Sequence, residues 1–422
     1  MESNFEKEVQ ERAVLVGLNA DCFTKEQTAT DETLEELEAL LETAGGFCTA
    51  KVMQNRHTPD SHSFIGEGKA QEVRMLAEAT ESTMVIFDNE LSPGNIRALE
   101  EIIGLPVLDR SALILDIFAQ RARTKEGRLQ VELAQYQYLL PRLSGMGSSL
   151  SRQGGGIGTR GPGETKLESD GRHIRERIHR LEEELEQVRQ VRSVQRERRM
   201  KNSVPVVAIV GYTNAGKSTL LNKLTGAGIP ANNRLFDTLD TTSRQLKVSD
   251  NLDVILSDTV GFIAKLPHHL VNAFRATLEE LEYADLLLHV IDASDPNREE
   301  HIAVVDKLIA QLARKETPVL RCYNKADLVA KEDIPTGQDI VATSAAMGLG
   351  MEQLLAAIET ALGHARHHVT LCLPYSMGGQ VETLHNNAQV KSVDYTADGI
   401  EIEAVLDDIL YGRLKDYITK EC

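Results

Sequence analysis

The chain has 422 residues, of which 41% are hydrophobic, and it carries a formal net charge of -18 at pH 7. This length exceeds what one ordinary hydrophobic core organises and therefore predicts several domains. The negative charge excludes unselective nucleic-acid binding by the whole surface and argues against DNA as a partner. No apolar run approaches the roughly 20 residues that span a bilayer, and the acidic start MESNFEKEVQ is unlike a signal peptide. We expect a monomeric cytoplasmic protein without stable membrane insertion, although peripheral association with a membrane stays open.

The first part of the chain, residues 1–125, alternates short apolar runs with helical patterns. Ser92 can cap a helix N-terminus, Pro93 suits the first turn and Gly104 suits the C-terminus. Strands that alternate with helices predict a parallel α/β domain. The expected strands cover 13–18, 48–53, 84–88 and 105–109, and the expected helices cover 33–45, 69–79 and 92–104.

Residues 126–203 change to a heptad-like spacing of apolar residues, in two stripes that are each too narrow to fold alone. We expect an antiparallel helical hairpin whose stripes bury each other, with 144–170 as its exposed tip. Residues 121–201 contain 18 Lys and Arg against 11 Asp and Glu. This basic excess indicates a local anionic partner, although a solvated helical face would produce it too. The stripes are Leu129, Leu133, Tyr136, Leu140 and Leu143, and then Ile174, Ile178, Leu181, Leu185 and Val188.

The expected tip is rich in glycine, with eight glycines among residues 144–163, so ordering it costs much conformational entropy. Its sequence GTRGPGET superficially resembles a phosphate-binding loop, but it lacks the Lys-Ser/Thr ending and no apolar strand precedes it. Contact with a large polyanion is therefore favoured over nucleotide binding, and a plain flexible linker is the alternative. We expect Arg142 to add positive charge here. The candidate RNA contacts are Arg152, Gly154, Gly155, Gly156, Arg160, Gly161 and Lys166.

A stronger phosphate motif begins at residue 204, in VPVVAIVGYTNAGKSTLLNKL. The run Val206–Val210 predicts a buried strand, GYTNAGKS matches the P-loop pattern GxxxxGKS, and the next residues open a helix. Backbone amides and the helix N-terminus would surround the phosphates. We expect Lys217 to reach the β- and γ-phosphates and the Ser218 hydroxyl to ligate Mg²⁺. The candidate nucleotide contacts of this loop are Gly211, Asn214, Ala215, Gly216, Lys217, Ser218 and Thr219.

The motif DTVGF follows at 258–262, after the apolar run NLDVILS. Asp258 stands where a second carboxylate near Mg²⁺ is needed, and the Gly261 amide can sense the γ-phosphate. Between the two motifs, LFDTLDTTSR offers three threonines as the Mg²⁺ ligand of the triphosphate state, of which we choose Thr238 over Thr241 and Thr242. Lys217, Thr238 and Gly261 are therefore the catalytic candidates, and Ser218, Thr238 and Asp258 are the Mg²⁺ candidates.

The last motifs read the base. In NKAD at 324–327, the Asp327 carboxylate can accept both guanine edge donors, which adenine lacks, while Asn324 and Lys325 would brace the surrounding loops. TSA at 343–345 places Ser344 and Ala345 in a loop suited to the guanine O6. These motifs, in this order, predict a P-loop GTPase domain over 204–365 that binds GTP and GDP.

The remaining residues, 366–422, predict a small α+β domain, and GIEIEA within them alternates apolar and acidic side chains as a half-exposed strand would. The predicted fold class is therefore multidomain α/β: a parallel α/β domain, an antiparallel helical hairpin, a P-loop GTPase domain and a small α+β domain.

These motifs resemble those of the HflX family, within the Obg-HflX superfamily of P-loop GTPases. The resemblance covers nearly the whole chain and includes FIGEGKAQEV, GGGIGTRGPGETKLE, GYTNAGKSTL, LFDTLDTT and DTVGFIAKLPHHLVNAFRATLEE. It implies a protein that binds the large ribosomal subunit and splits or rescues stalled ribosomes under stress. It also implies that the glycine-rich tip reaches ribosomal RNA near the peptidyl-transferase centre.

Phe262 occupies the position where many GTPases place a glutamine that orients the attacking water. Phenylalanine has no hydrogen-bonding group, so we expect slow hydrolysis until the ribosome orders the switch loops. A potassium ion is a second possible helper, because Asn214 resembles the asparagine that binds potassium in some related GTPases. A loop-stabilising turn residue is the alternative for Asn214.

Two other functions fit the same motifs. One is a GTPase partner of a tRNA-modification enzyme, in which the hairpin would hold tRNA. The other is an RNA remodeller with a second ATP site in residues 1–120, since FIGEGK precedes a helix and Lys69 could meet a phosphate. Gly66 and Gly68 are equally explained as ordinary turn glycines.

Overall fold

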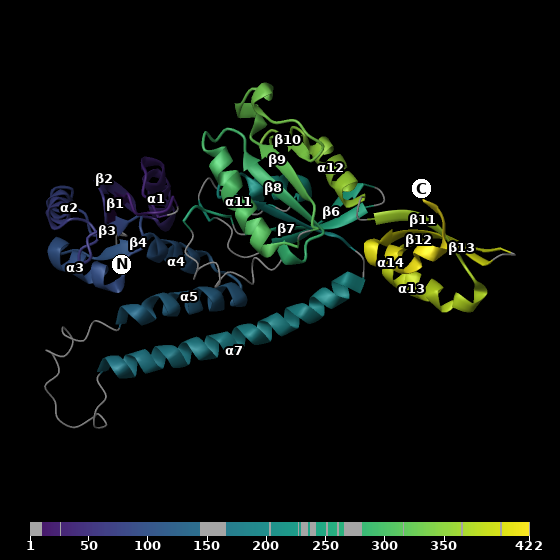
Figure 1. The fold of residues 1–422 in the computed structure, drawn as a ribbon, viewed down its shortest axis with the longest axis horizontal. Helices are drawn as coiled ribbons and strands as arrows, with labels where there is room; N and C mark the ends of the chain where they lie inside the picture. Colours follow the sequence, from purple (N-terminus) through teal and green to yellow (C-terminus); the bar gives the residue numbers. More distant parts are fainter. Residues whose placement is uncertain are drawn as a thin grey trace, which may run out of the picture. The chain divides into compact units, whose positions relative to one another are not determined.

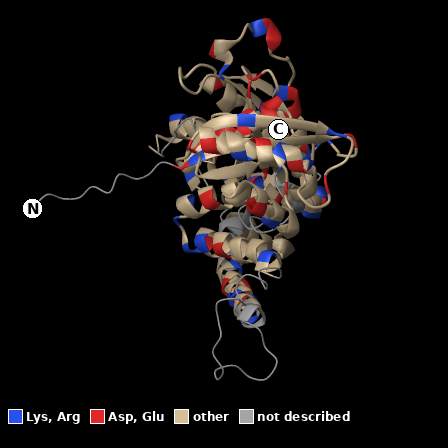
Figure 2. Ribbon diagram, turned by 90° about the vertical axis from the view of Figure 1, so that its left-hand side faces the viewer, with Lys and Arg blue, Asp and Glu red and all other residues tan. Residues whose placement is uncertain are grey.

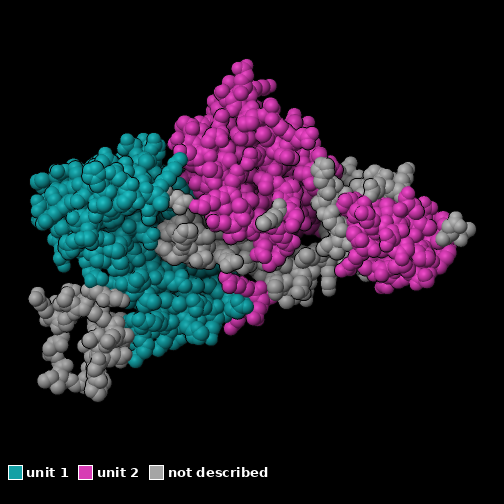
Figure 3. All heavy atoms as spheres, viewed as in Figure 1, with its two compact units in different colours: residues 1–186, 232–240, 263–275 teal, residues 187–231, 241–262, 276–422 magenta. Residues whose placement is uncertain are grey.

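The computed structural model forms two compact units, which Figure 3 distinguishes by colour. The first comprises Met1–Glu186, Asn232–Asp240 and Ile263–Arg275, and the second comprises Gln187–Ala231, Thr241–Phe262 and Ala276–Cys422. The structure describes residues 11–25, 27–143, 166–201, 204–226, 228, 235–236, 242–249, 252–259, 261–265, 281–314, 316–363, 366–396, 399–421.

The first unit contains a four-stranded parallel sheet in the order β2-β1-β3-β4, with helices in the connections (Figure 1). Strand β1 is buried along nearly its whole length, as expected for a strand covered on both faces. The predicted parallel α/β architecture is therefore confirmed. Its elements are β1 (Arg12–Ala20), α1 (Asp31–Ala44), β2 (Phe47–Arg56), α2 (Glu67–Ala79), β3 (Met84–Phe87), α3 (Pro93–Ile103) and β4 (Val107–Asp109).

The ends of helix α3 show how local chemistry sets these boundaries. The Ser92 side chain accepts a hydrogen bond from the Asn95 amide, and Pro93 occupies the first turn. Gly104 ends the helix with φ = 80°, a conformation that favours glycine. All three roles were predicted from the sequence.

The order of the strands creates a switch point in this sheet. Strand β2 lies on one side of β1 and β3 lies on the other, so the connections that leave β1 and β2 run in opposite directions. In open α/β sheets the crevice beside such a point, at the carboxyl ends of the strands, is the usual place for a ligand.

Three further helices follow, α4 (Arg110–Arg121), α5 (Lys125–Leu143) and α7 (Lys166–Lys201). Helix α5 packs on α4, and α7 runs beside α5 (Figure 1), joined to it by an Arg177–Glu132 ion pair of 2.7 Å. The predicted stripes bury each other only in part, because α4 covers some of α5. The buried members are Leu129, Leu133, Leu181 and Leu185, whereas Tyr136, Ile174, Ile178 and Val188 are half-buried.

The expectation that Arg142 supplies free positive charge to the tip is wrong. Its guanidinium donates a 3.0 Å hydrogen bond to the fully buried Asp109 carboxylate and lies 3.3 Å above the Tyr138 ring. The Tyr138 hydroxyl donates to the same carboxylate at 2.8 Å, and burial raises the pKa of Tyr138. Arg142 therefore neutralises a buried charge and fixes the end of α5.

Basic and acidic residues are interspersed over the face shown in Figure 2, without large fields of one sign. Residues 171–191 contain five Arg and five Glu. The positive excess of this region is therefore in 192–201 and in the tip, whose side chains lie outside the described part. The same holds for all seven candidate RNA contacts, because 144–165 and the Lys166 side chain are not described.

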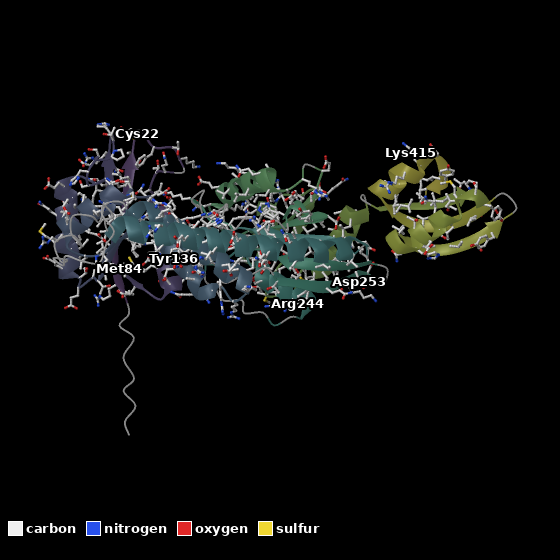
Figure 4. The ribbon with its side chains drawn as sticks, turned by 90° about the horizontal axis from the view of Figure 1, so that it is seen from below. Cys22, Met84, Tyr136, Arg244, Asp253 and Lys415 are labelled. Carbon is white, nitrogen blue, oxygen red and sulfur yellow. The ribbon has the colours of Figure 1, made fainter. Side chains whose placement is uncertain are left out.

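The second unit contains a six-stranded sheet in the order β10-β9-β8-β5-β7-β6, parallel except for β6. Strand β6 is an edge strand, and Figure 4 shows charged Arg244 on it and Asp253 on its neighbour β7; charge is a common protection of sheet edges. Its elements are β5 (Val206–Gly211), α8 (Lys217–Thr225), β6 (Thr242–Ser249), β7 (Leu252–Asp258), β8 (Leu286–Asp292), α11 (Arg298–Leu312), β9 (Val319–Asn324), η2 (Ala326–Leu328), β10 (Ile340–Ala342) and α12 (Met351–Gly363).

The end of the chain forms a four-stranded antiparallel sheet in the order β12-β13-β11-β14. Along β13, Ile400, Ile402 and Ala404 are buried while Glu401 and Glu403 are exposed. The alternation in GIEIEA is thereby confirmed as a half-exposed strand. The elements are β11 (Arg366–Leu373), α13 (Gly379–Asn387), β12 (Gln389–Thr396), β13 (Gly399–Asp407), α14 (Asp408–Leu414) and β14 (Ile418–Glu421).

Candidate functional site

The P-loop connects the end of β5 to the start of α8, and both of its motif glycines stand where no side chain fits. Gly211 has φ = 155°, and an added Cβ would lie 2.3 Å from the Val290 carbonyl oxygen. Gly216 has φ = 93°, and its added Cβ would lie 2.3 Å from Asn324 Nδ2. The glycines therefore allow the close backbone approach that a phosphate-binding loop requires.

Lys217, the first residue of α8, is only 6% exposed. Its ammonium donates hydrogen bonds to the Gly211 carbonyl at 3.0 Å and the Tyr212 carbonyl at 2.7 Å, so the side chain lies along the loop. Burial lowers the pKa of Lys217 to about 8, and Asp258 opposes this shift. A phosphate beside the ammonium would favour its charged form.

Ser218 and Asp258, two of the candidate Mg²⁺ ligands, lie together. The Ser218 hydroxyl donates a 2.8 Å hydrogen bond to Asp258 Oδ2, and Asp258 is 1% exposed at the end of β7. A hydroxyl and a carboxylate are the oxygen ligands that Mg²⁺ accepts beside nucleotide phosphates, so these residues fit that ion. Thr238, the third candidate, lies outside the described residues, as does Thr241, and Thr242 begins β6.

Gly261 lies against the P-loop. A Cβ added there would come within 2.9 Å of Thr213 Cγ2 and 3.0 Å of Lys217 Nζ. The next residue, Phe262, is 2% exposed and is held by backbone bonds, one from its N–H to the Gly211 carbonyl at 3.1 Å and one from the Thr213 N–H to its carbonyl at 2.7 Å. The Phe262 ring is thus packed inside and offers no group that could orient water.

Asn324 connects the three loops that surround the expected base site. Its Nδ2 donates to the Ala215 carbonyl at 2.9 Å, and its Oδ1 accepts from the Ala345 amide at 2.9 Å and from the Thr343 hydroxyl at 3.4 Å. The Asn324 side chain therefore ties the P-loop to the NKAD and TSA segments, and it is 2% exposed.

The other residues of these loops divide between internal contacts and exposure. The Lys325 ammonium pairs with Asp292 Oδ2, and the buried Ser344 hydroxyl accepts from the Met347 amide at 3.2 Å. Asp327, by contrast, lies exposed in η2, where its carboxylate can meet a ligand. Asn214 is also exposed and has φ = 62°, which fits both a turn residue and a cation ligand.

Sequence reasoning missed Asp292 as a partner of this site. It is the last residue of β8, which is parallel to β5 and β9, so all three strands deliver their carboxyl ends to one edge. The apolar run LLLHVI directly before Asp292 was the available signal. Over the described residues, no group of three or more His, Cys, Asp or Glu could hold a metal ion, and no helix there has the length and apolar character to cross a membrane.

Profiles of known families match three consecutive parts of the chain. Residues 31–119 match a family described as GTP-binding GTPase N-terminal, 121–199 match GTP-binding GTPase Middle Region, and 206–325 match 50S ribosome-binding GTPase. Among solved structures, a complex of the protein SsGBP with GDP is 26% identical, with a TM-score of 0.49, and covers 84% of this chain and 99% of its own.

Curated relatives match over most of their length. The protein named GTPase HflX from Caldanaerobacter subterraneus subsp. tengcongensis is 48% identical over 410 residues, which are 97% of this chain and 94% of the relative. The GTPase HflX of Escherichia coli is 45% identical over 375 residues, 87% of each chain. The chain therefore belongs to the HflX family of P-loop GTPases, which bind guanine nucleotides and hydrolyse GTP.

Proposed function

We propose that this GTPase binds the large ribosomal subunit through its N-terminal domain and helical hairpin, and that it splits or rescues stalled ribosomes under stress. The observation that carries this proposal is the match of residues 206–325 to a family described as 50S ribosome-binding GTPase. The excess of 18 Lys and Arg over 11 Asp and Glu in residues 121–201 supports a polyanionic partner for the hairpin.

Triphosphate binding would control this interaction. With GTP bound, the Gly261 amide meets the γ-phosphate and Thr238 joins Ser218 and Asp258 around Mg²⁺, which orders both switch segments. Mg²⁺ supplies charge neutralisation on the phosphates, and Lys217 adds to it. Because Phe262 cannot orient water, contact with the ribosome accelerates hydrolysis, and the GDP form leaves. Potassium held by Asn214 is a second accelerator in this scheme.

Sedimentation of 70S ribosomes through sucrose gradients tests the proposal. With a non-hydrolysable GTP analogue, the protein should sediment with the large subunit and convert 70S particles into separate subunits. With GDP it should stay near the top of the gradient. Equal sedimentation of the two nucleotide forms with ribosomal particles would rule the proposal out.

The alternatives make different predictions. A partner of a tRNA-modification enzyme would co-purify with tRNA and leave ribosomes intact. An RNA remodeller with an ATP site in residues 1–120 would hydrolyse ATP after Lys217→Ala. The contacts of FIGEGK do not favour that site, since the Gly66 amide donates to Gln54 Oε1 at 3.1 Å and Lys69 pairs with Glu72.

A further inference from the structure

The switch point of the N-terminal sheet holds a buried cluster of four charged side chains. Asp88 directly follows β3, Arg110 begins α4 and Glu36 lies on α1; the fourth member is Lys265, which lies four residues after Gly261 in the chain. Asp88 is fully buried, and the side chains of Arg110 and Lys265 are 2% and 9% exposed.

The contacts within the cluster are specific. Asp88 pairs with Lys265 through Oδ2 and with Arg110 through Oδ1, the latter at 2.8 Å, and Arg110 also pairs with Glu36. Thr33, in the first turn of α1, donates to Asp88 at 2.7 Å and accepts from the Lys265 ammonium at 3.3 Å. Arg110 further donates to the Ala264 carbonyl at 3.3 Å. Both the backbone and the side chain of the segment 263–265, here called the docking segment, are therefore held.

The place of this cluster gives the contact its meaning. The crevice at a switch point is where open α/β sheets usually bind ligands, and in this sheet the Lys265 side chain occupies it. Burying an ammonium is unfavourable unless a carboxylate pairs with it, so Asp88 and Lys265 match each other chemically. Lys265 also has φ = 55°, an uncommon conformation for a residue with a side chain, which persists only where the surroundings enforce it.

A second contact of the same kind involves the segment before Thr238. Phe236 is 3% exposed with φ = 54°, and its ring meets that of Phe118, on α4, edge-to-face at 4.7 Å between centroids. Residues 232–240 and 263–275 both belong to the compact unit of the N-terminal sheet. The two segments that flank the expected switch residues are thus packed on N-terminal elements.

We propose that Lys265 is a positioning residue for GTP hydrolysis and that the N-terminal sheet is its receptor. The loop that carries Gly261 is fixed at one end by β7, which ends at Asp258, and at the other end by the docking segment. A loop held at both ends has less conformational freedom to lose when its amide meets the γ-phosphate. Gly261 already lies against Lys217 in this arrangement, so docking favours the geometry that hydrolysis needs.

The inference rests on the GTPase activity and not on a ribosomal partner, so its test uses the full-length protein without ribosomes. The primary variant is Lys265→Met, which removes the ammonium but leaves the Asp88–Arg110 pair in place. Lys265→Arg keeps the charge. Lys51→Met is the matched control, because Lys51 pairs with Glu38 in the same unit, away from the docking segment.

We expect Lys265→Met to lower kcat by about tenfold, since small displacements of reacting groups have large effects on rate. Its KM and its affinities for GTP and GDP should stay near wild type, because Lys265 touches no nucleotide contact named above. Lys265→Arg should retain most of the activity and Lys51→Met all of it. Asp88→Asn should slow hydrolysis as well, and adding Lys265→Met to it should cause little further loss, because both changes break one interaction.

Thermal unfolding of each variant accompanies the kinetics, because Asp88→Asn removes a buried charge and could unfold the sheet. Lys265→Met then carries the test alone. An unchanged or raised kcat for Lys265→Met overturns the proposal, as does a loss confined to nucleotide affinity. An equal loss in Lys265→Arg would also overturn it, since charge would then not hold the segment.

Discussion

Ser218 Oγ donates a 2.8 Å hydrogen bond to Asp258 Oδ2, which joins the start of α8 to the end of β7. If these two oxygens hold Mg²⁺, Asp258→Asn should lower the rate of GTP hydrolysis by about 10²-fold and raise the Mg²⁺ concentration that gives half-maximal rate. Ser218→Ala should raise the Mg²⁺ requirement as well. Titration of hydrolysis with Mg²⁺ measures both, and an unaltered titration curve would contradict the assignment.

Asp327 is the exposed carboxylate of the NKAD segment, and we expect it to select guanine. Asp327→Asn should weaken GTP binding by about 10⁴-fold and should favour xanthosine triphosphate, whose edge suits an amide. Competition between the two nucleotides in a binding assay gives the ratio. If the variant still prefers guanine, another residue reads the base.

Removal of residues 153–163 separates the glycine-rich tip from the GTPase chemistry. Intrinsic hydrolysis should stay at the wild-type rate, because the candidate nucleotide contacts all follow residue 203. Stimulation by ribosomes should be lost, since the deleted stretch contains Arg160 and most of the glycines proposed to meet RNA. Rates with and without 50S subunits provide the comparison, and stimulation that survives the deletion would refute the role of the tip.

A monovalent cation at Asn214 would make turnover depend on the salt used. Hydrolysis should be faster in potassium than in sodium at equal ionic strength, and Asn214→Ala should remove the difference. Identical wild-type rates in the two salts would leave Asn214 as a turn residue, in agreement with its φ of 62°.

His289, 1% exposed within strand β8, should make the protein acid-sensitive. Burial lowers the pKa of His289, which Asp306 at 3.5 Å only partly opposes. The unfolded chain therefore takes up a proton near pH 6.5 that the folded chain resists, so stability falls as the pH drops below that value.

His289→Leu should flatten the dependence of the free energy of unfolding on pH between 7 and 5. Denaturant unfolding at several pH values measures this, and replacement of the exposed His385 by Gln is the control. An equally steep dependence in the His289→Leu protein would assign the acid sensitivity to other groups.

The parallel sheets could be predicted because their strands are short continuous apolar runs, as in Val206–Val210, and because caps such as Ser92 act within three residues. The P-loop and its companion motifs were recognisable for a related reason, since each combines a strand end with a fixed local pattern. These features depend on neighbours in the chain.

Contacts between distant residues could not be predicted in this way. Arg142 lies in a basic region and was interpreted as surface charge, because its buried partner Asp109 precedes it by 33 residues. Lys265 and Asp88 are separated by 177 residues, and nothing in the sequence near Lys265 indicates a buried carboxylate. Such pairs become visible only when the sheet has brought its strand ends to one edge.

The bonds of Asn324 to Ala215 and Ala345 limit how base preference could evolve in this protein. Any replacement of Asn324 disturbs the phosphate loop and the TSA segment simultaneously, and Gly216 leaves no space for a larger neighbour. Asp327 carries no such double duty among the described contacts, so a lineage could acquire a new nucleotide specificity through one codon there. Drift at Asn324, in contrast, would be removed by selection before specificity changed.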